Sequence, residues 1–287
     1  MPEGDTIRRL ADRITARFAG QCCRRCVTRD PRLVGVDFTG ATLVGAEAVG
    51  KHLLIRFDNG RTLHAHLLLT GSFRVGPASR EPEWRRRIEL WMDDGRLTGV
   101  DVPLLGVVAT VAEDQIVGHL GPDLCGAVAP DIDAMVARVQ RDPAAPLAGA
   151  LLDQQNIAGF GNVYAVELPF IVGVSPSQAV GTIEGLDALL RVGTAMIRLH
   201  ARSGPRNTTG RRLSVADHFV YGKAQRPCPV CGTTLLGWDD LHSPWRRVTV
   251  WCSMCQRQDA SRAVDIVRTR RLLALHPVRR EPLFPVV

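Results

Sequence analysis

Two pairs of cysteines near the end of the chain constrain its fold most strongly. They are Cys228-Pro-Val-Cys231 and Cys252-Ser-Met-Cys255, with twenty residues between them. This spacing is typical of a four-thiolate zinc site, in which the metal holds a hairpin too small to fold unaided. Because four thiolates leave no open position for substrate, we expect one structural Zn²⁺ ion. The alternative is a set of unrelated buried thiols.

The positive charge is concentrated in the last third of the chain. The whole chain carries a formal charge of +7, but residues 201–287 hold 15 Lys or Arg against 6 Asp or Glu, which is +9 and leaves −2 for the rest. Such a basic segment favours a polyanionic partner, although a solvated basic surface has the same composition. With neither a bilayer-spanning apolar stretch nor a signal peptide, we expect a cytoplasmic protein whose cysteines are thiols or metal ligands.

Hydrophobic periodicity divides the chain. Apolar residues at helical spacing from Ile7 to Phe18 predict a helix, with Asp5 as its N-cap and Gly20 as its stop. Alternating segments with Asp-Asn-Gly and Asp-Asp-Gly turns predict hairpins at 53–69 and 88–100.

Residues 132–139, 147–155 and 162–171 have helical patterns. We therefore expect an α+β multidomain protein. Its predicted parts are an N-terminal β-sandwich (1–120), a linker (121–145), a helical domain (146–224), a zinc ribbon (225–260) and a basic, partly disordered tail (261–287).

The chain opens with Met1-Pro2-Glu3-Gly4, which offers an unusual nucleophile. Once Met1 is removed, Pro2 presents a secondary amine beside an acid, Glu3. An α-amino group has a pKa of about 8, and the positive end of a helix disfavours its protonated form, so the free base is accessible at neutral pH. Many proteins begin Met-Pro, so this feature is informative only in combination.

Lys51 stands out because the chain otherwise uses arginine. Of 36 basic residues only Lys51 and Lys223 are lysines. An ammonium can give up a proton when its surroundings perturb it, whereas a guanidinium effectively cannot. Lys51 is thus a candidate for proton transfer, and the alternative is a turn residue before a strand.

A glycine turn joins two predicted helices. Leu151-Leu-Asp-Gln154 is followed by Ala158-Gly-Phe-Gly-Asn162. Glycines let a backbone approach phosphate closely, and the start of the second helix offers free N–H groups, to which Asn162 adds a donor. An ordinary helix–helix turn is the alternative.

These motifs occur in the order seen in one enzyme family. Together with Gly50-Lys51-His52, Val220-Tyr-Gly-Lys223 and Cys255-Gln256, they span residues 2–256. The chain resembles the formamidopyrimidine-DNA glycosylase and endonuclease VIII family. The resemblance implies a monomeric, bifunctional DNA glycosylase and AP lyase of base-excision repair. Such an enzyme turns the damaged nucleotide of double-stranded DNA out of the stack.

The resemblance also implies a role for each matched residue. Pro2 would attack the sugar C1′ and form an iminium, Glu3 would help to open the sugar ring, and Lys51 would donate a proton during β-elimination. Arg247 would contact phosphate and assist the second elimination, with Arg246 competing for this role. Further DNA contacts are expected from Asn162, Lys223 and His119.

The branch of the family is suggested by two stretches. Gly4 resembles the endonuclease VIII opening, and Asp101-Val-Pro-Leu-Leu-Gly106 lacks the Arg and Phe that the purine-selective branch inserts into DNA. We therefore expect oxidised pyrimidines to be favoured over 8-oxoguanine. Residues 66–71 resemble the loop that fills the gap left by the extruded nucleotide, with Leu68 and Leu69 as the wedge. A plain core strand is the alternative.

Three other readings remain open at this stage. The chain could be an 8-oxoguanine- or formamidopyrimidine-specific glycosylase, a catalytically silent protein that binds abasic sites, or a zinc-ribbon adaptor for nucleic acid. His64 and His66 share one strand face, where packing and hydrogen bonding are expected rather than metal binding.

Overall fold

The computed structural model describes residues 2–77, 80–202, 204–211, 215–239, 248–259, 261–282 and 284. The chain forms two compact units, Met1–His119 and Leu120–Val287. Among the described residues, no helix is both long and apolar enough to cross a membrane.

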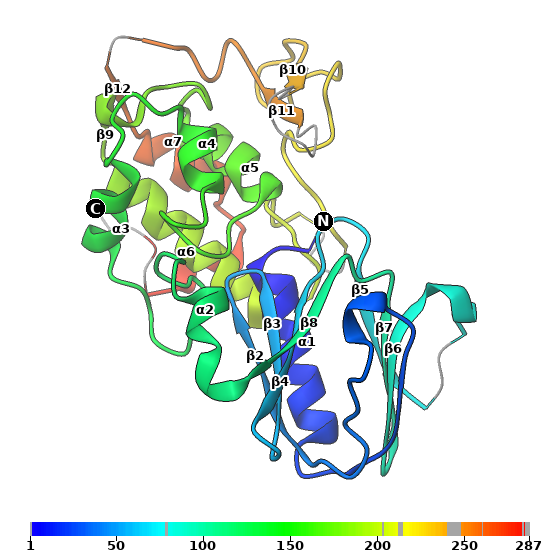
Figure 1. Ribbon diagram of the computed structural model, residues 1–287. Coiled ribbons are helices and arrows are strands. Elements are labelled where there is room, and N and C mark those ends of the chain that lie inside the picture. The colour runs from blue at the N-terminus through cyan, green and yellow to red at the C-terminus, as the bar shows by residue number, and fades with distance from the viewer. Residues whose placement is uncertain are drawn as a thin grey trace. The chain divides into compact units, whose positions relative to one another are not determined.

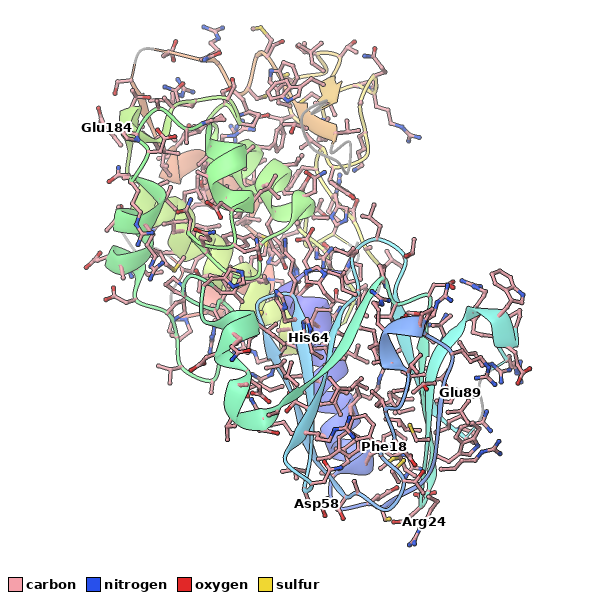
Figure 2. The ribbon with its side chains drawn as sticks, in the orientation of Figure 1. Phe18, Arg24, Asp58, His64, Glu89 and Glu184 are labelled. Atoms are coloured by element: carbon pink, nitrogen blue, oxygen red, sulfur yellow. The ribbon has the colours of Figure 1, made fainter. Side chains whose placement is uncertain are left out.

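The first unit is a β-sandwich with one long helix (Figure 1). Its two antiparallel four-stranded sheets have the orders β1-β6-β7-β5 and β2-β3-β4-β8. Helix α1 (Gly4–Phe18) packs on β2 and β3 with its apolar face, and its last residue, Phe18, is fully buried (Figure 2). The strands are β1 (Cys23–Thr28), β2 (Leu43–Val49), β3 (His52–Phe57), β4 (Arg61–His66), β5 (Ser72–Gly76), β6 (Arg86–Met92), β7 (Gly95–Val100) and β8 (Leu104–Ala109).

The predicted sandwich and both hairpins are confirmed, but the start of α1 differs from the prediction. The N-cap is Glu3, whose extended backbone lets its carbonyl accept the N–H groups of Thr6 and Ile7. Asp5 instead lies in the first turn, where its carboxylate accepts the Thr6 N–H at 2.8 Å. The helix therefore begins before its first strongly apolar residue, which hydrophobic spacing alone cannot locate.

The second unit is built mainly from helices, together with a small two-stranded hairpin. Helix α5 has buried residues on every side, so it forms the centre of this unit's core. The helices of the unit are α3 (Ile132–Val139), α4 (Leu147–Leu152), α5 (Asn162–Val172), α6 (Leu186–Arg202) and α7 (Ile266–Leu272). Its strands are β9 (Ile183–Glu184), β10 (Leu236–Asp239), β11 (Val248–Trp251) and β12 (Arg262–Ala263), while the short helix α2 (Asp114–Val117) belongs to the first unit.

Helix α4 is shorter than the predicted helix at 147–155. It ends at Leu152 because the carboxylate of Asp153 accepts the backbone N–H of Gln155 at 2.9 Å, a local turn that competes with helix. Helix α3 has the predicted bounds.

The segments expected to be a linker and a loose tail both contribute to the second unit's core. Helix α3, within 121–145, buries Ile132, Met135 and Val139. In the C-terminal segment, β12 pairs with β9, and Leu273 and Val278 are buried. The first segment is rich in Pro, Gly and Ala and the second in Arg, and these compositions concealed the contacts because only a few apolar side chains anchor each segment.

Candidate active site and metal centre

The N-terminal residues combine an accessible Pro2 with a buried acid. Pro2 is half-buried and lies directly before α1, whereas the side chain of Glu3 has no exposed surface. The neighbouring Asp5 is also fully buried. A carboxylic acid thus stands beside the chain's first imino group at the positive end of a 15-residue helix.

Lys51 is buried in the same unit. It occupies the turn between β2 and β3, where Gly50 adopts a φ of 57°, and only 7% of Lys51 is exposed. Its charge acts on two neighbours, because it contributes to the lowered pKa values of His52 and His66. The structure therefore places the predicted proton donor near the imidazoles of His52 and His66.

Four histidines form this cluster, which we call the histidine cluster: His52, His64, His66 and His119. His52 Nδ1 and His64 Nε2 are 2.9 Å apart, and the two rings stack (Figure 2 labels His64). His66 and His119 meet the His52 ring edge-on. Hydrogen bonding and packing, as expected for His64 and His66, account for these contacts.

Three members of the histidine cluster, His52, His64 and His66, are held neutral. Burial, followed by the charges of His66, His64, His119 and Lys51, lowers the pKa of His52 to about 3. Burial and then Lys51 lower the pKa of His66 to about 4, and burial lowers the pKa of His64. Because these three imidazoles are neutral at neutral pH, they place no further positive charge near Lys51.

This cluster predicts a stability that falls with acid. The pKa values of His52 and His66 in the folded chain lie below the value of about 6.5 in the unfolded chain. Between these values the unfolded chain binds more protons than the folded chain. The free energy of unfolding therefore decreases as the pH falls from about 6.5 towards 4. Thermal unfolding between pH 7.5 and 5.5 should show a falling Tm. The slope should be smaller in a His52→Gln/His64→Gln variant, and an equal slope in both proteins would contradict the assignment.

The predicted wedge is a well-defined turn after β4. Leu68 has a φ of 45°, and its N–H donates to His66 Nδ1 at 3.2 Å. Gly71 closes the turn on the carbonyl of Leu67, where a Cβ would come within 2.7 Å of that oxygen. Leu69 is 48% exposed at the tip, while Leu68 is half-buried. Of the two candidates, Leu69 is therefore the more exposed.

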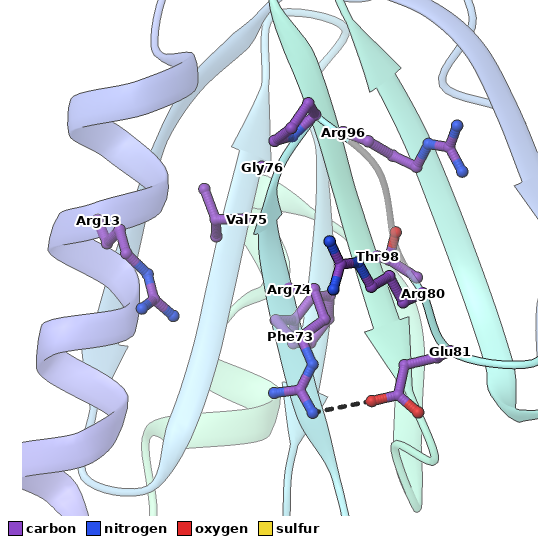
Figure 3. A pocket seen from close by; sticks show the side chains of 10 residues that line it. Arg13, Phe73, Arg74, Val75, Gly76, Arg80, Glu81, Arg96 and Thr98 are labelled. Carbon is purple, nitrogen blue, oxygen red and sulfur yellow. Dashed lines mark hydrogen bonds and ion pairs between the residues drawn. The ribbon is translucent and has the colours of Figure 1, made fainter.

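Two cavities open on the first unit. One of about 530 Å³ is lined by α1, β5 and β7, with Arg13 projecting from α1 and Arg74 paired to Glu81 at 2.9 Å (Figure 3). The other, of about 610 Å³, includes Thr70 of the wedge turn. Pro2 and Lys51 line neither of them.

The four cysteines predicted to bind zinc come together in the second unit. All four sulfur atoms lie within 4.8 Å of one another, with Cys228 and Cys255 Sγ atoms 3.9 Å apart and Cys231 and Cys252 Sγ atoms 3.4 Å apart. Tetrahedral thiolates around zinc are separated by about 3.8 Å. The sulfur cluster can hold a metal ion, and its size fits zinc. Arg246 and Arg247, between β10 and β11, lie outside the described residues.

The predicted glycine turn is fixed by Gln154. Its side-chain amide donates to the carbonyl of Phe160 at 3.0 Å, and its carbonyl accepts the N–H of Gly159, which has a φ of 120°. Asn162 opens α5, is 6% exposed and donates to the backbone carbonyl of Val248 in β11 at 3.1 Å. Asn162 thus ties the helix to the hairpin that follows the first cysteine pair.

A buried carboxylate that the sequence did not single out organises the segment around Lys223. Glu167 accepts the backbone N–H groups of Phe219, Val220 and Tyr221, each at 2.7 Å. Its only signal in the sequence is its position as the one charged residue of an apolar helix. Lys223 donates to the carbonyl of His218 and lies 3.7 Å from Asp217, so its ammonium also supports this segment.

Comparison with known proteins identifies the family. A family model described as the formamidopyrimidine-DNA glycosylase N-terminal domain matches residues 1–107. A probable endonuclease 8 2 of Streptomyces coelicolor is 41% identical over 271 residues, covering 91% of this chain and 96% of that protein. The chain belongs to the formamidopyrimidine-DNA glycosylase and endonuclease VIII family. A DNA-(apurinic or apyrimidinic site) lyase Nei2 of Mycolicibacterium smegmatis is 38% identical, covering 89% and 99%.

The more distant relatives locate the chain within this family. A formamidopyrimidine-DNA glycosylase of Stutzerimonas stutzeri is 29% identical, covering 90% of this chain and 99% of that protein, so the endonuclease 8 relatives are nearer, as predicted. A solved Lactococcus lactis formamidopyrimidine-DNA glycosylase, bound to DNA containing an AP site, matches with a TM-score of 0.74 at 20% identity over 90% of this chain and 100% of that one. This likeness confirms the predicted fold class.

Proposed function

We propose that this protein is a bifunctional DNA glycosylase and AP lyase of base-excision repair, acting on double-stranded DNA that contains damaged bases or abasic sites. The observation that carries the proposal is the pairing of an accessible Pro2 with a fully buried Glu3 at the start of α1. Endonuclease 8 and AP-lyase relatives that align along most of the chain support it. Because the substrate is chromosomal DNA, the same proposal places the work of the enzyme in the cytoplasm.

In the proposed reaction, the nitrogen of Pro2 attacks C1′ of the damaged nucleotide. The C1′–base bond breaks, and the base leaves with the bonding electrons and takes up a proton. Glu3 delivers a proton to the ring oxygen, so the sugar opens and an iminium joins Pro2 to C1′. The cationic iminium withdraws electrons, C2′ loses a proton, and the 3′ phosphate is expelled. Lys51, near the neutral imidazoles of His52 and His66, donates a proton to the departing phosphate oxygen during this elimination.

The metal in this proposal is a single structural Zn²⁺ held by Cys228, Cys231, Cys252 and Cys255. It would supply no chemistry at the sugar, because four thiolates close its coordination shell. Its effect would be to fix the β10–β11 hairpin, which carries Arg246 and Arg247 as proposed phosphate ligands. Asn162, Lys223 and His119 are proposed as further contacts to DNA.

Oxidised pyrimidines are the proposed lesion class. The segment from Asp101 to Gly106 carries no Arg or aromatic side chain that could enter the DNA stack beside Leu69. The competing reading is a preference for 8-oxoguanine or formamidopyrimidine. Cleavage assays on matched duplexes with thymine glycol, dihydrouracil, 8-oxoguanine or an abasic site decide between them. We expect nicking at the first two and at the abasic site, and an absence of nicking on all four substrates would refute the proposal.

The wedge assignment gives a separate prediction. Leu69→Ala should lower kcat/KM on duplex DNA roughly tenfold, the effect of losing about 1.4 kcal/mol of apolar contact with unstacked bases. Single-stranded substrate should be cleaved at the normal rate, because no stacked gap must be filled. Val44→Ala, which truncates another exposed apolar side chain of the first unit, serves as the control. Equal losses on single- and double-stranded substrates would contradict the role of Leu69.

A further inference from the structure

The 610 Å³ cavity lies directly beside the proposed wedge. Thr70, which follows Leu69, lines it together with Asp30, Arg32, Arg87 and Asp101. The Thr70 hydroxyl donates to the carbonyl of Asp101 at 3.4 Å, so the wedge turn and the end of β7 form adjoining walls. Leu69, the side chain proposed to fill the gap in the duplex, thus has next to it an open cavity that is large enough for a nucleobase.

The walls of this cavity are held in strained conformations. Leu68 and Asp101 each have a φ of 45°, and within the described part of the first unit they are the only non-glycine residues with positive φ. Leu68 directly precedes Leu69, and Asp101 lines the cavity. Such backbone strain persists only where surrounding contacts impose it, and it is concentrated at binding and catalytic sites.

Two of the three arginines near the cavity are already engaged. Arg32 binds the Asp30 carboxylate, with Nη2 at 2.6 Å from Oδ2, and donates to backbone carbonyls of the 102–103 segment. Arg85 binds Asp101 at 2.6 Å. Arg87 is half-buried and lines the cavity, and its charge helps to lower the pKa of Asp30, yet its guanidinium makes no hydrogen bond and no ion pair within 4 Å with any residue that the structure describes.

The charges of the lining favour a neutral ligand over a phosphate. Asp30 and Asp101 balance Arg32 and Arg87, so the lining carries no net charge. The guanidinium of Arg87 donates no hydrogen bond to the described residues and offers only donors, which calls for a ligand edge with two adjacent acceptors. Guanine presents such an edge at O6 and N7, whereas adenine places an amino donor beside N7.

We propose that this cavity receives the base opposite the lesion and that Arg87 reads it as guanine. The inference rests on the proposed function, because it assumes that Leu69 enters damaged duplex DNA. It narrows the class of preferred lesions. Lesions derived from cytosine lie opposite guanine, and they are processed faster than lesions derived from thymine, which lie opposite adenine.

The test uses one lesion and varies only the opposite base. Full-length protein is assayed on duplexes with an abasic site opposite each of the four bases, and on the same abasic strand alone. We expect a kcat/KM about tenfold higher opposite guanine than opposite adenine, the scale of one bidentate base contact. In Arg87→Gln this ratio should fall below about twofold, with single-strand cleavage unchanged.

Two further variants test whether the guanine preference comes from recognition of the base by Arg87 or only from its positive charge. Arg87→Lys keeps the positive charge but loses the planar fork, so it should also lose the guanine preference while retaining DNA affinity. Arg13→Gln removes one arginine from the other cavity, shown in Figure 3, where its side chain has no ion pair with the described residues. It should lower binding to all four duplexes equally and keep their ratio.

The outcomes distinguish this inference from the proposed function. Equal cleavage opposite all four bases, faster cleavage opposite adenine, or a guanine preference that survives Arg87→Gln would overturn the role of the cavity and leave the lyase activity established. Wild-type protein that cleaves neither the single strand nor any duplex would overturn the proposed function, and this inference with it.

Discussion

Protein that carries an extension before Pro2 should lose glycosylase activity by at least about a thousandfold, as is usual when a covalent nucleophile is removed. An extension, or simply a retained Met1, turns the imino group of Pro2 into an amide nitrogen that cannot attack C1′. Pro2 is half-buried and α1 starts on the carbonyl of Glu3, so an added residue need not disturb the helix. Single-turnover cleavage of a thymine glycol duplex measures the effect.

One control uses the extended protein itself, and a second uses a Pro2 variant. Its affinity for a duplex with a reduced abasic analogue should stay within about twofold of the processed protein, because binding uses surfaces other than the amine. Pro2→Gly replaces the secondary amine of the ring by a primary amine on a flexible residue, which is no longer held in position for attack, so it should also fail to form the trapped adduct. Undiminished cleavage by the extended protein would show that another group is the nucleophile, and Lys51 would become the first alternative.

Replacing Cys252 by serine should abolish stoichiometric zinc binding and weaken binding to DNA by about a hundredfold or more. Structural zinc contributes about 10–16 kcal/mol to folding in small zinc-finger peptides, and the β10–β11 hairpin has little core of its own. Strand β11 packs against α5, and Asn162 binds its first residue, Val248, so loss of the metal should also loosen the start of that helix. Metal content and fluorescence anisotropy with labelled duplex measure the two effects.

Cys125→Ser is the matched control for this prediction. Cys125 is a buried thiol of the same unit but lies outside the cysteine cluster. It should keep one zinc per chain and normal affinity for DNA, and the first unit should unfold at the same temperature in all three proteins. A Cys252→Ser protein that retains both metal and affinity would show that the cluster is not the proposed zinc site.

Features written as local patterns could be predicted from the sequence. Alternating apolar residues around Asp93-Asp-Gly95 predict the β6–β7 hairpin, and the spacing of the two cysteine pairs predicts the cysteine cluster. Both patterns are contained in a short stretch of chain. The bounds of α3 were predicted for the same reason, because Asp131 caps it locally.

Features that depend on contacts distant in sequence could not be predicted. The role of Glu167 requires the backbone of residues 219–221 to be folded against α5, and the packing of the C-terminal segment requires a complete helical core. The histidine cluster joins His52, His64 and His66 through the register of β3 and β4, and the turn after α2 adds His119, which composition does not reveal. The conformation of Leu68, a leucine in a region favoured by glycine, contradicts local preference and therefore had no signal in the sequence.

The most direct test of the central claim is to identify the residue that becomes linked to DNA. Protein is incubated with an abasic duplex and borohydride, which reduces an iminium to a stable amine, and the adduct is digested and mapped by mass spectrometry. We predict a single modified peptide that begins at Pro2, with the sugar fragment on its α-nitrogen. A modification on Lys51 or any other side chain, or no adduct under conditions in which the strand is cut, would contradict the account.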